Sequence, residues 1–165
     1  MRKLNYAVVM AMFIAFICVL PVVAQDQEFG DKAAKGGAME VELGRMAAIK
    51  AQNAAVKSFG RRMVTDHTKA GNKLKALAKR KGLSLSTQLD TTQRAEVQRL
   101  AQLKGAEFDR AYMEMMVSDH EKDVAEFEME ANSGTDKDLK MFASQTLPTL
   151  KVHLQLAKDT AAKVK

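Results

Sequence analysis

Apolar residues recur every three to four positions along most of the chain, the spacing that places them on one side of an α-helix. No long stretch alternates between apolar and polar residues in the manner of a half-buried strand. The pattern therefore predicts an all-α protein with four long helices. They are expected over about residues 27–51, 53–81 and 105–132, and from about residue 136 onward.

Residues that commonly begin and end helices stand between these stretches. Asn53 is a favourable N-cap, and Gly82 follows the cations that close the second helix. Asp90 and Gln93 have the spacing of a capping box, which predicts a short helix to about Lys104 in the connection between the second and third long helices. Tight connections after the first and third long helices, and a longer one after the second, predict an antiparallel four-helix bundle.

One segment of the chain is repeated. Residues 63–69 (MVTDHTK) return 53 positions later as residues 116–122 (MVSDHEK). The repeat places His67 and His120, two of the three histidines, at equivalent positions on the otherwise apolar sides of two helices. We expect Met63 and Met116 to face the same core. The aromatic residues predicted to be among the most buried are Phe59, Tyr112, Phe127 and Phe142.

The first 24 residues have the features of a secretory signal peptide. Arg2 and Lys3 precede an uncharged apolar run over residues 6–20, and small residues precede a cleavage position after Ala24. A single mature domain, residues 25–165, is then expected in the periplasm or outside the cell, with no membrane-spanning segment. The alternative is an uncleaved anchor, although the apolar run is shorter than the roughly 20 residues of a spanning helix.

Charge is distributed unevenly between two of the predicted helices. Residues 53–81 contain nine Lys and Arg against one acid, and residues 105–133 contain nine Asp and Glu against two bases. One interpretation is that the two helices pack against each other. Another is that their charged sides pair with a second copy of the chain or with the cell envelope. Nucleic acid is not expected as a partner, because the basic side has no interleaved aromatic residues.

Several motifs together resemble a family of uncharacterised exported bacterial domains, often labelled predicted outer membrane proteins. The resemblance implies a ferritin-like helical bundle of undetermined biochemical role. The chain differs from the iron-oxidising ferritin-like proteins, which carry Glu-x-x-His on two helices. Val64 and Val117 stand where those glutamates would be. The motifs are residues 36–44 (GGAMEVELG), 63–69 (MVTDHTK), 108–113 (FDRAYM), 119–122 (DHEK) and 146–150 (TLPTL), with His153.

Four polar residues fall on the apolar sides of the long helices, one on each helix: Glu40, His67, His120 and His153. Counting from the turns at about 1.5 Å per residue places Glu40 and His67 within about one turn of each other and leaves His120 and His153 offset by about 7 Å, all near the middle of the bundle. Three imidazoles and a carboxylate suit a divalent transition metal such as zinc, copper or iron. The sequence therefore offers a candidate metal site in the middle of the bundle.

Asp66 and Asp119 each stand next to one of these histidines and are candidates to hold a ligating imidazole by its other nitrogen. Adjacent helical residues diverge by about 100°, so Asp66 is expected to contact His120, and Asp119 to contact His67. The alternative interpretation is a buried polar layer in which the histidines are neutral or paired with aspartate and bind no metal.

No motif supports a catalytic site. The mature chain would lack a cysteine nucleophile, and the sequence has no Gly-x-Ser-x-Gly and no glycine-rich phosphate loop. We therefore interpret the sequence as an exported bundle that binds a ligand or protects the envelope under stress, and not as an enzyme. The alternatives are a metalloprotein with a mid-bundle site and a module that self-associates into a homo-oligomer through its charged helices.

Overall fold

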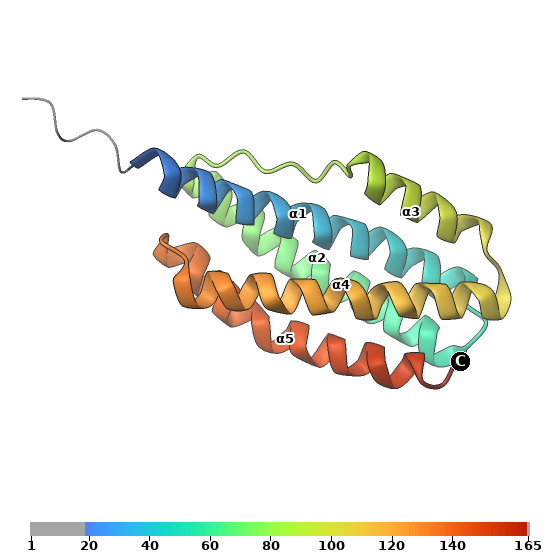
Figure 1. Cartoon of the computed structure of the whole chain (residues 1–165). Coiled ribbons are helices and arrows are strands. Elements are labelled where there is room, and N and C mark those ends of the chain that lie inside the picture. Colours follow the sequence, from blue (N-terminus) through green and yellow to red (C-terminus); the bar gives the residue numbers. More distant parts are fainter. Residues whose placement is uncertain (1–18, 165) are drawn as a thin grey trace, which may run out of the picture.

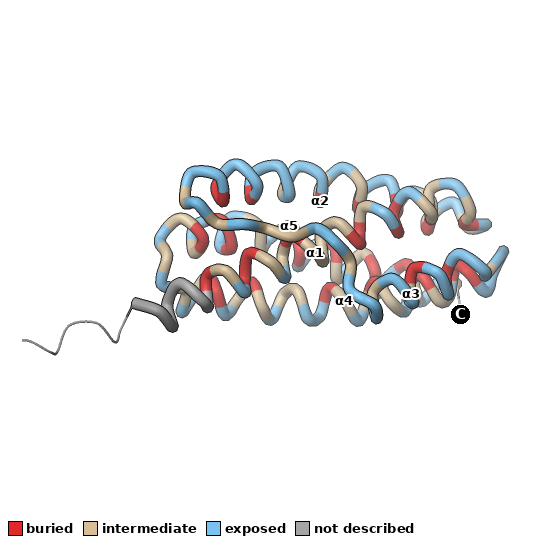
Figure 2. Tube along the Cα trace, turned by 90° about the horizontal axis from the view of Figure 1, so that it is seen from above, coloured by how far each residue is buried: buried red, intermediate tan, exposed pale blue. Residues whose placement is uncertain are grey.

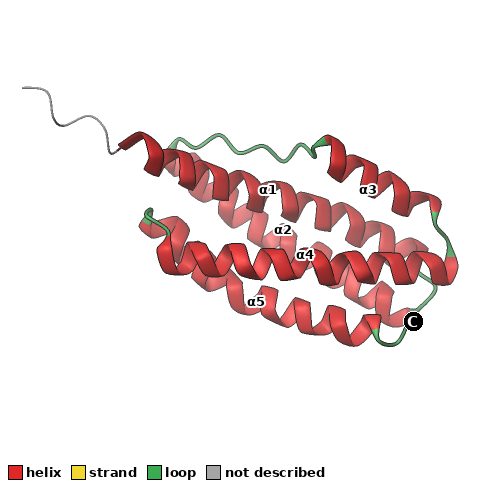
Figure 3. Cartoon of the chain, in the orientation of Figure 1, coloured by secondary structure: helices red, strands yellow, loops and turns green. Residues whose placement is uncertain are grey.

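The computed structural model describes residues 19–164, which form five helices and contain no strand (Figures 1 and 3). This confirms the prediction of an all-α protein. The elements are α1 (Val19–Lys50), α2 (Ala54–Lys81), α3 (Thr91–Gln102), α4 (Gly105–Ser133) and α5 (Lys137–Ala161).

The four long helices lie side by side as a bundle (Figure 1). Helix α1 packs antiparallel to α2, and α4 packs antiparallel to α5; the two pairs meet along α1–α4 and α2–α5. The connection between the pairs travels the length of the bundle and includes α3, which lies against α1 and α4. As a result, α2 and α4 run in the same direction on opposite corners of the bundle.

This arrangement corrects one expectation. The basic helix α2 and the acidic helix α4 are not packing neighbours, because each packs on α1 and α5 instead. The acids of α4 pair with lysines of those two helices. The pairs are Glu126 with Lys32 at 3.7 Å, Glu128 with Lys151 at 2.6 Å, and Glu121 with Lys158 at 2.8 Å.

Side chains hold the helix ends where the sequence placed them. Asn53 accepts a 2.8 Å hydrogen bond from the backbone of Ala55, and Gly82 ends α2 with φ of 69°. Asp90 and Gln93 exchange the two hydrogen bonds of a capping box at the start of α3. The existence of these helices and their capping residues were thus predictable, although α3 ends at Gln102 and not at Lys104.

The start of α1 differs from the prediction. The helix begins at Val19 and not near Gln27, so it continues across the cleavage position predicted after Ala24. Most of the predicted signal peptide, residues 1–18, lies outside the described residues, and its cleavage remains a prediction. Among the helices of residues 19–164, none combines the length and apolar character needed to cross a membrane.

The buried residues line the inner sides of the four long helices (Figure 2). They form two apolar clusters: one surrounds Met63 and Met116, which both have no exposed surface, and the other surrounds Phe127 and Leu139. Met63 and Met116 share one core, as the repeat predicted. Phe59, Tyr112, Phe127 and Phe142 are all buried, but only Tyr112, with no exposed surface, is among the most buried residues as predicted; the other three are 5–8% exposed.

Helices α1 and α2 approach each other most closely at two glycines. A Cβ on Gly44 would lie 2.7 Å from the carbonyl oxygen of Gly60, and a Cβ on Gly60 would lie 2.7 Å from that of Gly44. Gly36 and Gly37 make no comparable approach, because a Cβ on either would stand 3.8 Å or more from its neighbours. The crossing at Gly44 sets the spacing of the two helices that carry Glu40 and His67.

Candidate functional site

A buried polar layer separates the two apolar clusters of the core. It contains one residue from each long helix: Glu40 from α1, His67 from α2, His120 from α4 and His153 from α5. Their exposed fractions are 2%, 7%, 0% and 1%, respectively. The structure therefore brings together the four residues that the sequence singled out, in a place where polar atoms need partners within the protein.

The three imidazoles lie in contact with one another. The distances between ring centroids are 5.7 Å for His67 and His120, 5.3 Å for His67 and His153, and 5.4 Å for His120 and His153. One ring nitrogen from each residue lies within 4.8 Å of one from each of the others. The three rings thus present nitrogens to a common region at the centre of the bundle.

Glu40 lies beside two of these rings. Its Oε2 is 2.9 Å from Nδ1 of His67, and its Oε1 is 3.3 Å from Nε2 of His120. Neither contact meets strict hydrogen-bond geometry, but at 2.9 Å the His67 imidazole still acts on Glu40 as a charged and hydrogen-bonding neighbour. The carboxylate is therefore already engaged by two imidazoles.

The ring of His120 is oriented by its own helix. Its Nδ1 lies 2.8 Å from the carbonyl oxygen of Met116, one helical turn earlier. A carbonyl can only accept, so Nδ1 carries the proton and donates it. In the neutral ring, Nε2 is then the nitrogen with the free lone pair, and it points toward the carboxylate of Glu40.

The ring of His153 is oriented from a neighbouring helix. Its Nε2 lies 2.8 Å from Oδ2 of Asp66, which also accepts a 3.3 Å hydrogen bond from Nε of Arg62. The expectation that Asp66 contacts His120 is therefore wrong. Asp66 is on the side of α2 that faces α5, and His120 is on the opposite corner of the bundle. The donation to Asp66 leaves Nδ1 of His153 with the lone pair.

One nitrogen of each ring is buried without a hydrogen-bond partner: Nε2 of His67, Nε2 of His120 and Nδ1 of His153. In His120 and His153 this is the nitrogen that the hydrogen bond on the other side of the ring leaves unprotonated. For His67, the nearby Glu40 oxygen favours a proton on Nδ1, and Nε2 is the ring nitrogen on the side away from Glu40. Three unpaired ring nitrogens in a dry interior are costly unless something binds them.

The same surroundings shift the pKa values of the layer. Burial alone would raise the pKa of Glu40, but the three histidines outweigh it and lower the pKa. Burial opposes protonation of His67, yet the Glu40 carboxylate raises its pKa above the usual value. Burial lowers the pKa of His153 to about 4, with the other two imidazoles adding to the effect and Asp66 opposing it.

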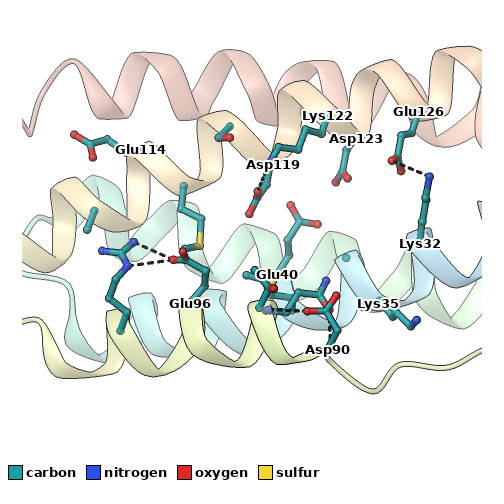
Figure 4. A pocket seen from close by; sticks show the side chains of 18 residues that line it. Lys32, Lys35, Glu40, Asp90, Glu96, Glu114, Asp119, Lys122, Asp123 and Glu126 are labelled. Carbon is teal, nitrogen blue, oxygen red and sulfur yellow. Dashed lines mark hydrogen bonds and ion pairs between the residues drawn. The ribbon is translucent and has the colours of Figure 1, made fainter.

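Asp119, the second aspartate singled out by the sequence, does not contact His67. Its Oδ1 lies 3.5 Å from Nζ of Lys122, and it lines a cleft of about 610 Å³ between α1, α3 and α4 (Figure 4). Asp123 lines the same cleft and was not singled out by the sequence, because it is one of many acids on α4. Its position one turn after His120 was the available signal.

The fold and the layer define a class: a bundle of four long helices with a buried carboxylate and three imidazoles at its centre. The chain belongs to the family described as a domain of unknown function, DUF4142, which matches residues 20–160. A DUF305 fragment from Deinococcus radiodurans has a similar fold, with a TM-score of 0.75 and 16% identity over 84% of this chain and 96% of that one. No curated protein matches the chain.

Proposed function

We propose that this protein is an exported, ferritin-like bundle that binds a divalent transition-metal ion between Glu40, His67, His120 and His153. The observation that carries the proposal is the set of three buried ring nitrogens without hydrogen-bond partners, together with a carboxylate between two of the rings. An ion accepts all four lone pairs at once, which removes the cost of burying them.

The partners of the rings support this function. A metal-binding histidine usually donates its second nitrogen to a carbonyl or carboxylate, which fixes the tautomer and aims the ligand nitrogen. His120 donates to the carbonyl of Met116, and His153 donates to Asp66.

The distances also suit an ion. Two ligands on a tetrahedral zinc lie about 3.3 Å apart, given metal–ligand bonds of about 2.0–2.1 Å. The separation between Oε1 of Glu40 and Nε2 of His120 is 3.3 Å, so this pair already has the spacing of two ligands on one ion. The three imidazoles each offer one nitrogen within 4.8 Å of the others, and Glu40, which lies outside that group, adjoins it through His120.

The ligand set points to binding and not to catalysis. Catalytic zinc sites keep three protein ligands and an open position, whereas four protein ligands close a tetrahedral site. Nitrogen-rich sets of this kind suit zinc, copper(II) and iron(II). We therefore infer a role in holding or buffering an ion in the periplasm or outside the cell, and no enzymatic reaction.

The topology supports the ferritin-like part of the proposal. In ferritin-like bundles one long crossover joins two antiparallel pairs, so that the second and third long helices run in the same direction. The connection from α2 to α4 has this form (Figure 1). Self-association through the charged helices has less support, because acids of α4 are engaged by lysines of α1 and α5.

The test is elemental analysis of protein exported by its host and purified without chelator or affinity-tag histidines. Thermal scans with added zinc, copper(II) and iron(II) follow, on the wild type and on Glu40→Gln. The matched control is Glu42→Gln, because Glu42 is exposed on the same helix. An ion that binds only the folded state stabilises it by about 2.7 kcal/mol when its free concentration is roughly 100 times Kd.

We expect stoichiometric metal and a rise in Tm for the wild type and Glu42→Gln, and a much smaller rise for Glu40→Gln. The absence of metal in the native protein, together with no rise in Tm for any ion, would reject the function. The layer would then be a structural polar layer only.

A further inference from the structure

The ligands of the proposed centre are buried, so an ion must reach them along some route. The cleft of about 610 Å³ between α1, α3 and α4 has Glu40 as part of its lining (Figure 4). A second, small cavity of about 30 Å³ lies inside the bundle and is lined by Glu40 and His67. Glu40 and Asp123 line both spaces, and therefore stand between solvent and the imidazoles.

The two copies of the repeated segment differ in what their aspartates contact. Asp66 and Asp119 are equivalent in the repeat, one on α2 and the other on α4. Asp66 meets an imidazole, His153. Asp119 lines a cleft into which Glu40 presents a carboxylate, and Asp123 adds another carboxylate from the same wall (Figure 4). In the first copy of the repeat the aspartate contacts an imidazole, whereas in the second copy the equivalent aspartate lies near other carboxylates.

Neighbouring carboxylates repel one another unless a cation lies between them. Few basic side chains of the cleft are free to pair with these carboxylates. Lys32 pairs with Glu28 and Glu126, and Arg99 pairs with Glu96; Lys122 reaches Asp119 at 3.5 Å with most of its side chain exposed. The remaining base is Lys35, on the rim. Within residues 19–164, Asp123 has no salt-bridge partner. The buried Glu40 carboxylate faces only the imidazoles of His67 and His120, and neither oxygen has a well-aligned hydrogen bond.

Other directions are less suited to a cation. The small cavity is bounded on its α2–α5 side by apolar side chains, among them Leu74, Phe142 and Leu150. On the same seam, Asp66 is partly exposed, but it already holds His153 and stands beside the guanidinium of Arg62. An incoming divalent ion would have to displace a cation there.

We propose that Asp119 and Asp123, with Glu40 beneath them, form a loading site at the floor of the cleft, where a divalent cation binds before passing to the imidazoles. This inference rests on the proposed function, because it names the route to that centre. Carboxylate oxygens bind hydrated divalent ions readily. Glu40, which lines both spaces, is the ligand common to the loading site and the inner centre.

The experiment uses the complete mature protein, freed of metal. Stopped flow with a chromophoric chelator measures the rates at which zinc associates and dissociates. Asp123→Asn removes a loading carboxylate. Gly36→Leu narrows the cleft beside Asp123 and leaves all four residues of the inner centre unchanged, because a Cβ on Gly36 would lie 3.9 Å from Oδ1 of Asp123, in ordinary van der Waals contact. The matched control is Glu121→Gln, which removes the same charge from the opposite side of α4, where Glu121 pairs with Lys158.

We expect Asp123→Asn to slow association by about tenfold or more, because the loading site loses an oxygen donor that can bind the incoming ion as a carboxylate. Gly36→Leu should slow association and dissociation by the same factor and leave Kd unchanged, because a narrowed route changes the barrier and not the end states. Glu121→Gln should behave as the wild type. Equilibrium Kd values confirm that each variant keeps its inner centre.

Unchanged rates in both Asp123→Asn and Gly36→Leu, with normal Kd values, would overturn the loading site and leave the metal centre intact. A loss in Glu121→Gln equal to that in Asp123→Asn would also overturn it, since the effect would then be general attraction. Wild-type protein that binds no zinc, copper(II) or iron(II) would overturn the function and the loading site together.

Discussion

Asp66 of α2 accepts a 2.8 Å hydrogen bond from Nε2 of His153 across the seam between α2 and α5. Asp66 is partly exposed, whereas the histidine it holds has 1% of its surface exposed. The proton is thereby kept on the outer nitrogen of the ring, and Nδ1 is turned inward with its lone pair. A residue near the surface thus determines which atom of a buried ring faces the centre.

Replacing Asp66 by Ala should lower metal affinity without removing a ligand. Loss of such a supporting acceptor typically costs 10- to about 100-fold in affinity, because the ring loses its fixed tautomer and orientation. Competition titration with a chelator of known affinity measures the change. Arg62→Gln is the control, because it leaves the Asp66–His153 bond in place. Equal Kd values for Asp66→Ala and the wild type would show that His153 is not a ligand.

The stability of the metal-free protein should pass through a maximum near neutral pH. The pKa of His153 is about 4 in the folded protein against 6.5 when unfolded. The unfolded chain therefore takes up a proton first, and up to about 3 kcal/mol of stability is lost as pH falls from about 6.5 toward 4. His67 has a raised pKa, so its contribution is present below about 6.5 and is lost as pH rises through the folded value.

Urea unfolding of chelator-treated protein across this pH range measures the two limbs separately. The variant His153→Gln should flatten the acid limb, and His67→Gln should flatten the alkaline limb. If both variants kept the pH profile of the wild type, other groups would govern the pH dependence of stability.

Gly44→Ala should destabilise the fold, because its Cβ would stand 2.7 Å from a backbone carbonyl that cannot move freely. Overpacking of this kind typically costs about 1–3 kcal/mol. Gly71 provides the control on α2: a Cβ there would meet nothing within 4 Å. Gly71→Ala should therefore stabilise by up to about 1 kcal/mol, from helix propensity alone. Denaturant midpoints of the two variants should move in opposite directions from the wild type.

Phe127→Ala should cost about 3–5 kcal/mol, the usual range for a buried phenylalanine. The ring is 7% exposed and makes an edge contact with Phe29 at 5.1 Å between centroids, and lies 6.0 Å from Phe142. Met129 is two residues away on α4 and 61% exposed, so Met129→Ala should change stability little. Similar midpoints for the two variants would show that the second apolar cluster contributes less than its burial indicates.

Much of the fold followed from local rules in the sequence. The apolar spacing determined which side of each helix is buried, and side chains such as Asn53 and Asp90 determined where helices begin, because both effects act within a few residues. The four residues of the polar layer were found in the same way. Each stands on an apolar stripe, and counting from the turns placed Glu40 and His67 within about one turn of each other. It left an offset of about 7 Å between His120 and His153, whose rings are 5.4 Å apart in the structure.

Relations between helices could not be read in this way. Whether Asp66 meets His120 or His153 depends on which helix occupies the neighbouring corner, and the charges of α2 and α4 suggested the wrong neighbour. The contact between His120 and the backbone carbonyl of Met116 could not be predicted either, because a backbone carbonyl is present at every residue and does not show in the sequence. Asp123 was hidden among the acids of α4, since only the position of α1 and α3 distinguishes the side of the helix that lines the cleft.

The polar layer is divided between two separate stretches of chain. Glu40 and His67 come from the first antiparallel pair, His120 and His153 come from the second, and residues 82–104 connect the pairs. Neither pair contains three imidazoles, and His153 stands on the last helix. The proposed set of ligands is therefore complete only when α5 has docked on the first pair, so that capture of an ion at the proposed centre would require both halves of the bundle to have assembled.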